Sequence, residues 1–310
     1  MKEARLVLLG IMVLVLSACV PATEEQPAQP TEAPTPAATA SVQEIVRVTN
    51  DPGVEFWPRP SPDGKNLLFG VYDDTKNNID AYSVALVSTK GVGKRLIAGP
   101  GAMSATWLPD GSGIVYIYLG SGRAIVRSPI AGAGLTFITN NQVGERDGEP
   151  DVSPDGKRVA FGTLVRGVSF IYSVGIDGSA VTQYVQGSSP RWSPSGEKIA
   201  FDREVGSSRY QLFVIDIGTG QVTQLTTGNY SNAYPAWSPD GQWITFQSNR
   251  EGRNQVYIMK ADGTSVTQLT RGDGESITPN WSSDGFIYFV SKQINQWGAA
   301  DIWRLKPKLP

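Results

Sequence analysis

Short apolar stretches alternate with polar turns along most of the chain. The clearest example is residues 235–270, which contain four stretches that favour strands, at residues 235–237, 243–247, 255–259 and 266–270. Runs of this length, bounded by Ser, Pro, Asp, Gly and Asn, predict short β-strands. No stretch has the period of about 3.6 residues that marks an amphipathic helix. The pattern predicts an all-β chain.

One phrase, Ser-Pro-Asp-Gly followed by an apolar strand, recurs six times. Its third position is occupied by Asp63, Asp110, Asp155, Ser195, Asp240 and Asp284, at spacings of 47, 45, 40, 45 and 44 residues. The phrase is a tight turn, because Pro presets φ, Asp can bond the backbone and Gly accepts a positive φ. Four strands per period of this length predict a six-bladed β-propeller of four-stranded antiparallel blades.

The strand count also predicts how the ring closes. The last repeat has only three strands and ends at Asp301–Leu305, whereas an unassigned strand, Ile45–Thr49, precedes the first repeat. We expect this N-terminal strand to pair with the last blade and close the ring, since closure removes exposed sheet edges. The propeller domain is therefore predicted to span residues 42–310.

The blade phrase P-x-W-S-P-D-G, an apolar strand and a later Q-L-T strand resembles the WD40-like (PD40) propeller repeats of the TolB family. Similar repeats occur in the propellers of prolyl-oligopeptidase-type enzymes. The Q-L-T strands are Gln224–Thr226 and Gln268–Thr270, and the resemblance covers about residues 44–306. It implies a propeller that binds an envelope protein, as TolB binds a peptidoglycan-associated lipoprotein. The α/β domain that precedes that propeller is not seen here, so the resemblance implies a relative and not TolB itself.

The N-terminal residues predict an export signal and a lipid anchor. Lys2 and Arg5 precede the uncharged stretch Leu6–Leu16, which fits a signal-peptide core and is too short to span a bilayer. Leu16–Cys19 (Leu-Ser-Ala-Cys) resembles the lipobox of bacterial lipoproteins. The resemblance implies that residues 1–18 are removed and Cys19 is lipidated; the alternative is an ordinary secretory signal with an incidental cysteine. We expect an extracytoplasmic protein anchored to the cell membrane, at its outer face or in the periplasm of a diderm.

Residues 19–41 follow as the lipidated cysteine and a Pro/Ala/Thr-rich tether. Only Val20 is a sizeable hydrophobe between residues 20 and 41, so the segment cannot offset the entropy of folding. In polyproline II geometry it would reach at most about 70 Å. We interpret it as a spacer; a role as a proline-motif ligand is the alternative.

Composition excludes several kinds of chemistry. The chain has 27 basic and 29 acidic residues, a net charge of −2, which gives no strong attraction for nucleic acid. It has no histidine and one cysteine. This rules out a Ser-His-Asp triad, a His-ligated metal, an intrachain disulfide and a Cys-rich zinc site. We expect no metal site and no cofactor.

One aromatic series recurs at a fixed position of the repeat. Trp107, Trp192, Trp237 and Trp281 occupy it, with Pro60 and Val152 in the other two blades. One aromatic ring per blade could form a ligand cage, but constant phase favours packing between blades. We interpret the tryptophans as core.

A candidate binding face follows from family geometry, which places the loops before the first strands and those between second and third strands on one side of the ring. These loops vary among the repeats, and variable loops on a rigid scaffold usually carry binding. The candidate residues are Glu55, Trp57, Arg146, Asp147, Glu149, Arg203, Tyr230, Tyr234, Arg250, Arg253, Asp273 and Glu275. Both charge signs and several aromatics suit a peptide or protein surface. The alternative for each residue is an ordinary solvated loop position.

Three functions remain open at this point. The first is a non-catalytic, membrane-tethered monomer that binds an envelope protein or peptide at the channel mouth. The second is a carbohydrate-active or other histidine-independent propeller enzyme, using carboxylates such as Glu145, Asp147 and Glu149 or Asp273 and Glu275. The third is a structural envelope protein that packs against other surface proteins. The missing histidine and the lack of a G-x-S-x-G elbow favour a protein that is not an enzyme.

Overall fold

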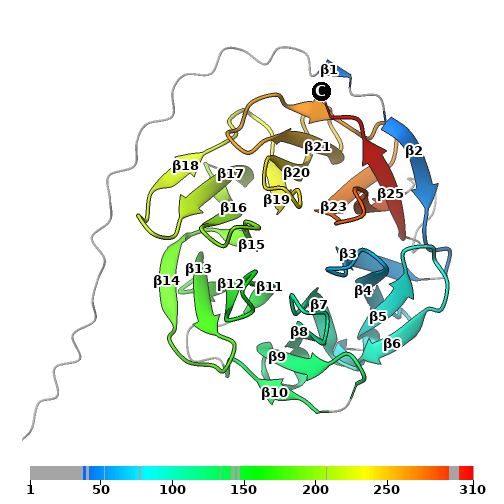
Figure 1. Ribbon diagram of the computed structural model, residues 1–310, viewed down its shortest axis with the longest axis vertical. Helices are drawn as coiled ribbons and strands as arrows, with labels where there is room; N and C mark the ends of the chain where they lie inside the picture. Colours follow the sequence, from blue (N-terminus) through cyan, green and yellow to red (C-terminus); the bar gives the residue numbers. More distant parts are fainter. Residues whose placement is uncertain are drawn as a thin grey trace, which may run out of the picture.

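Six β-sheets form a ring around a central axis in the computed structural model (Figure 1), which confirms the predicted six-bladed propeller. The structure describes residues 38–39, 42–51, 53–76, 78–132, 134–140, 144, 147–206, 208–292 and 300–309. Helix among these residues is limited to two 3₁₀ turns, Asn78–Ala81 and Leu119–Ser121. The predicted signal peptide, Cys19 and most of the predicted tether lie outside the described residues.

Each blade starts at the channel and proceeds outward. The first three blades consist of β3 (Val54–Pro60), β4 (Asn66–Tyr72), β5 (Tyr82–Ser88) and β6 (Arg95–Ala98); β7 (Ala102–Trp107), β8 (Gly113–Tyr118), β9 (Ala124–Pro129) and β10 (Thr136–Phe137); and β11 (Gly148–Val152), β12 (Arg158–Val165), β13 (Val168–Gly175) and β14 (Thr182–Gln186). The next two consist of β15 (Ser188–Trp192), β16 (Lys198–Val205), β17 (Arg209–Asp216) and β18 (Val222–Gln224); and β19 (Asn232–Trp237), β20 (Trp243–Ser248), β21 (Gln255–Lys260) and β22 (Thr267–Gln268). β1 (Ala38–Thr39) adds a parallel edge strand to β22, within the segment interpreted as tether.

The sixth blade joins the two ends of the propeller domain. It contains β23 (Glu275–Trp281), β24 (Ile287–Lys292), β25 (Asp301–Pro307) and, as its outermost strand, β2 (Val42–Arg47). β2 runs antiparallel to β25, with Ile45 opposite Leu305. The predicted closure by an N-terminal strand is therefore confirmed.

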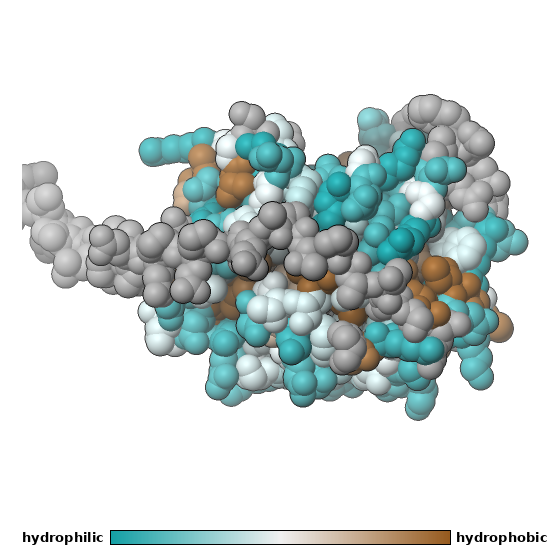
Figure 2. Space-filling view, turned by 90° about the horizontal axis from the view of Figure 1, so that it is seen from above, coloured by the Kyte–Doolittle hydropathy of each residue, from teal (hydrophilic) through white to brown (hydrophobic). Residues whose placement is uncertain are grey.

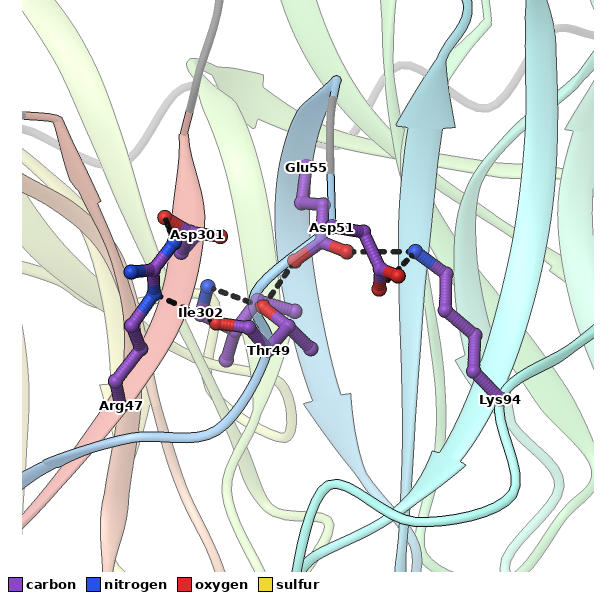
Figure 3. A network of polar contacts seen from close by, with 7 residues as sticks. All are labelled: Arg47, Thr49, Asp51, Glu55, Lys94, Asp301 and Ile302. Carbon is purple, nitrogen blue, oxygen red and sulfur yellow. Dashed lines mark hydrogen bonds and ion pairs between the residues drawn. The ribbon is translucent and has the colours of Figure 1, made fainter. Parts of the chain in front are cut away.

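A polar network fixes this closure to the first blade (Figure 3). The Thr49 hydroxyl accepts a hydrogen bond from the Ile302 backbone N–H at 2.9 Å and donates one to the Glu55 carboxylate. Lys94 Nζ lies 2.9 Å from Glu55 Oε1 and 2.7 Å from Asp51 Oδ2. Since Lys94 belongs to the first blade and Ile302 to the last, the network spans the junction of the ring.

The apolar core lies between the blades. Trp107 is 8% exposed and packs with Leu68 of the preceding blade, and its indole donates to the Arg59 carbonyl at 2.9 Å. Trp237 donates to the Arg191 carbonyl in the same way, at 3.1 Å. The tryptophan series is therefore blade-to-blade packing, as interpreted. Seen from the edge of the ring, hydrophilic residues cover much of the upper and lower surfaces and hydrophobic residues lie between them (Figure 2).

The Ser-Pro-Asp-Gly turns repeat one hydrogen-bond pattern. In the first blade Ser61 Oγ donates to Asp63 Oδ1 at 2.6 Å, and the Lys65 N–H donates to the same oxygen at 3.1 Å. Gly64 takes a φ of +68°, which a glycine adopts without steric cost. These bonds hold the pKa of Asp63 below its usual value, so the carboxylate stays ionised in the turn. The Asp63 carboxylate therefore stabilises the turn.

Candidate functional site

Every inner strand carries a β-bulge with one residue in the left-handed region. The six residues are Trp57, Ser104, Glu149, Ser189, Tyr234 and Thr278, with φ between +50° and +54°. A non-glycine residue in this conformation costs on the order of 1 kcal/mol or more. Bulges also redirect side chains next to binding sites. The ring thus holds six strained positions at one level of its channel.

Five of these six residues line a cavity of about 570 Å³ at the channel mouth, on the side where the inner strands begin. We call it the mouth cavity. Second strands, the start of the third strand β17 and loops add polar side chains to its wall, among them Asp202, Tyr210, Ser231, Gln247 and Asn249. A volume between about 300 and 1,000 Å³ is typical of a binding pocket. This wall differs from blade to blade, so it can recognise an asymmetric ligand.

Asp202 is the most perturbed acid of the mouth cavity. It lies on β16, is 2% exposed, and accepts a hydrogen bond from the Tyr234 N–H at 3.0 Å. Burial and the nearby charge of Glu149 raise the pKa of Asp202 to about 7. The same Glu149 charge, followed by burial, raises the pKa of the Tyr234 phenol. This part of the cavity is therefore acidic and suits a cationic or hydrogen-bond-donating group.

A second cavity of about 250 Å³ opens at the other end of the channel, where the inner strands run into the Ser-Pro-Asp-Gly turns. We call it the turn-side vestibule. Trp192, Trp237 and Trp281 contribute to its wall, together with the repeated prolines and serines. Arg59 and Arg191, each 7% exposed, lie at its floor. The vestibule and the mouth cavity share no lining residue.

A constriction separates the two cavities. Its free space is only about 10 Å³, and it is bounded by Trp57 and Tyr234, which also line the mouth cavity, and by Arg59 and Arg191, which also line the vestibule. The channel is therefore narrow between its two chambers.

Three of the predicted binding residues, Trp57, Glu149 and Tyr234, line the mouth cavity. Glu55 and Asp147 do not: each is 1% exposed and accepts a hydrogen bond from a threonine that follows an outer strand. The Asp147 bond comes from Thr139 at 2.6 Å. Burial raises the pKa of both carboxyls, and these hydrogen bonds oppose the shift. Their contacts stabilise the junctions between blades.

The remaining predicted residues are dispersed. Arg203 lies 3.9 Å from the ring centre of Phe213. Arg250 lies over Tyr230 and Tyr257, at 4.8 and 4.5 Å, and donates to Asn232 Oδ1 at 3.0 Å.

Away from the channel, Arg253 and Asp273 line a separate peripheral hollow. Glu275 accepts a hydrogen bond from Asn254 Nδ2 at 3.1 Å. Arg146 and Glu145 lie outside the described residues. The structure therefore brings together only the part of the predicted face that sits on the bulges.

Sequence reasoning missed five charged residues that line the two cavities: Arg123, Asp202, Arg59, Asp151 and Arg191. The last three occupy the variable position of the P-x-W phrase, where the other blades have Thr106, Ala236 and Asn280. A charged residue at this position departs from the repeat, so the sequence alone could have identified these three residues as candidates for a site. Asp202 is an acid inside the apolar strand β16, and its partners became apparent only from the fold.

No group of three or more Asp, Glu, His or Cys residues among those that the structure describes is placed to hold a metal ion. No helix of the described ranges has the length and apolar character required to cross a bilayer.

Comparisons with known proteins agree with the fold. Residues 149–305 match the TolB beta propeller domain family (PD40). An uncharacterized protein of Agrobacterium fabrum is 32% identical over 162 residues, 48% of this chain and 52% of that protein. The Tol-Pal system protein TolB of Alcanivorax borkumensis is 31% identical over 80 residues, 24% of this chain and 18% of that one. The chain thus spans about half of the first relative and less than a fifth of the second.

Among solved structures, TolB of Acinetobacter baumannii superposes with a TM-score of 0.68 at 21% identity, covering 80% of this chain and 65% of that one. At this identity the likeness shows the fold alone. The family match itself extends over half of the chain. The chain therefore belongs to the TolB β-propeller domain family.

Proposed function

We propose that the protein is a non-catalytic, membrane-tethered module that binds a segment of an envelope protein or peptide in the mouth cavity. The observation that carries the proposal is the acidic pocket formed by Glu149 and Tyr234, which occupy strained bulges, and by Asp202 of the neighbouring strand β16. Strained, non-glycine positions concentrate at functional sites because the surrounding fold must hold them in place.

The pocket suggests the chemistry of the bound segment. A volume of about 570 Å³ accommodates a few side chains and not a folded domain. The carboxylates favour a basic side chain or an amino group, and Trp57 offers an aromatic surface against its stem. Lipidation at Cys19, followed by the tether, would hold this pocket outside the cytoplasmic membrane.

Capture from the native envelope tests the proposal. The full chain and a Glu149→Lys variant are immobilised and challenged with envelope extract, with a photo-crosslinker placed at Tyr210 on the cavity wall. A matched control, Glu197→Lys, reverses an exposed acid beside a Ser-Pro-Ser-Gly turn. We expect a crosslinked protein with the wild type and the control, and none with Glu149→Lys. Equal crosslinking in all three would refute binding at the mouth cavity.

One observation favours a second candidate, a histidine-independent glycan-cleaving enzyme. A buried acid with a pKa of about 7 beside a second carboxylate, as in Asp202 and Glu149, is the arrangement that general acid–base catalysis requires. Incubation with cell-wall and extracellular polysaccharides tests it by chromatography of the products. Turnover that disappears in Asp202→Asn would establish catalysis, whereas unchanged polysaccharide would leave the binding function.

A further inference from the structure

Two buried arginines line the floor of the turn-side vestibule. Arg59 lies on β3 of the first blade and Arg191 on β15 of the fourth, so they come from opposite sides of the six-bladed ring (Figure 1). Both line the vestibule and the constriction behind it. Both are 7% exposed, although arginine is seldom buried without a partner.

Their hydrogen-bonding capacity is largely unused. Arg191 Nη1 donates to the Pro190 carbonyl at 2.7 Å, but the buried Nε has no hydrogen-bond partner in the part of the chain that the structure describes. Among the described residues, no carboxylate oxygen lies within 4.0 Å of either guanidinium group. Asp151 shares the floor, and its Oδ2 accepts from the Trp192 N–H at 2.8 Å.

The charges at the floor are not paired directly. Among the lining residues of the vestibule, Arg59 and Arg191 contribute two positive charges and Asp151 one negative charge. Glu149 and Asp202, which line the mouth cavity, act from farther away on Arg59 and Arg191 respectively. Burial, and then repulsion from Arg191, lower the pKa of Arg59 to about 9 against the opposing charges of Asp151 and Glu149, so Arg59 stays cationic at neutral pH. A bound anion would offset both the burial and the repulsion of the two guanidinium groups.

We propose that the turn-side vestibule binds a small oxyanion, a carboxylate or phosphate group held between Arg59 and Arg191. The planar fork of each guanidinium matches these groups and forms paired hydrogen bonds with them. The vestibule opens at the turn face, and its volume of about 250 Å³ leaves room for the body of a small organic acid or phosphate ester. Trp192, Trp237 and Trp281 offer aromatic edges to that body. This site is separate from the mouth cavity and does not depend on the function proposed there.

Calorimetric titration of the full chain tests the site. The probes are sodium phosphate and, separately, sodium acetate, at neutral pH and with ionic strength held constant by chloride. We expect one anion to bind per chain and Arg191→Gln to weaken it by about tenfold or more, because one guanidinium fork is removed. Arg191→Lys, which keeps the charge and loses the fork, should give an intermediate affinity.

The matched control is Arg95→Gln, an exposed arginine on the outer strand β6, which should leave the affinity unchanged. A change in tryptophan fluorescence on anion addition that is lost in Arg191→Gln gives a second readout, because three of the eight tryptophans line the vestibule. If Arg191→Gln does not fold, Arg191→Lys and Arg59→Lys decide the question. No binding at tens of millimolar anion, or equal affinity in all arginine variants, would overturn the proposal. Binding of phosphate alone or of acetate alone would identify the preferred group.

Discussion

The two chambers of the channel are built from the same six inner strands, yet they differ in almost every property. The mouth cavity is lined by bulge residues that change from blade to blade and is acidic at Glu149 and Asp202. The turn-side vestibule is lined by the repeated Trp-Ser-Pro phrase and is basic at Arg59 and Arg191. Trp57 and Tyr234 line the narrow passage between them.

The difference shows that repeated and non-repeated positions of this protein have different roles. The repeated residues serve the turns and the packing between blades, as the Trp107 indole and the Asp63 carboxylate illustrate. The charged residues stand where the repeats disagree, at the bulge and at the variable position of P-x-W. A scaffold position must suit every blade, whereas a binding position has to suit only one ligand.

The largest expected effect concerns the acidity of the mouth cavity. The pKa of Asp202 is raised from 3.8 to about 7, so the folded protein holds a proton that the unfolded chain releases. Stability should therefore fall as the pH rises from about 4 to about 7, by about 4 kcal/mol in total for this group. Asp202→Asn should remove this dependence and be more stable than the wild type above about pH 7, as measured by urea unfolding across this range.

The difference in stability between the wild type and Asp202→Asn reports on Asp202 alone, because Glu55, Asp147 and Asp151 titrate in both proteins. Asp240→Asn is the control on the other side of the ring. Its exposed turn carboxylate has a pKa lowered by the Ser238 hydroxyl, so its own contribution has the opposite sign. Parallel stability curves for wild type and Asp202→Asn would show that Asp202 is ionised like an exposed acid.

The next effect concerns the ring closure on which both chambers depend. Lys94→Met would leave Glu55, which is 1% exposed, without its cation. Breaking a buried ion pair on one side costs about 3 kcal/mol. Lys65→Met, which breaks an exposed pair with Asp63 at 3.7 Å, should cost less than about 0.5 kcal/mol. Equal losses of unfolding free energy in urea would mean that the junction does not stabilise the ring.

The fold was predictable because its signals are local. Each Ser-Pro-Asp-Gly turn carries its own hydrogen bonds, and the strands that follow are apolar in every copy. Counting strands was enough to predict the pairing of Ile45–Thr49 with the last blade, which β2 and β25 confirm. The short parallel strand Ala38–Thr39 was not predicted, since its sequence has no apolar pattern.

The site was predictable only in part, and the bulges explain the limit. Glu55 and Trp57 are two residues apart, and a regular strand would direct both side chains to one face. The left-handed residue Trp57 breaks this alternation: it lines the mouth cavity, while Glu55 turns to Thr49 in the interior. The bulge could not be predicted from residue type, because the residue with positive φ is not a glycine. The stacking of Arg250 on Tyr257 likewise required the folded blade.

The smallest expected effect is a difference in stability between two substitutions on one inner strand, one on the mouth side and one on the vestibule side. Ser104 is a strained bulge residue of the mouth cavity, with a φ of +51°, and Thr106 stands two residues on, at the variable P-x-W position. Ser104→Gly relieves a left-handed conformation worth about 1 kcal/mol or more and adds chain entropy to the unfolded state, for a net gain of about 0.5 kcal/mol.

Thr106→Gly relieves no positive φ and removes a side chain that is 7% exposed, so it should lose about 1 kcal/mol or more. Opposite signs in urea unfolding, two residues apart, would locate the strain on the mouth side alone. Losses in both variants would mean that the bulge stores no strain at Ser104. The mouth cavity would then differ from the vestibule in its charges and in the variety of its side chains, and not in the conformation of its backbone.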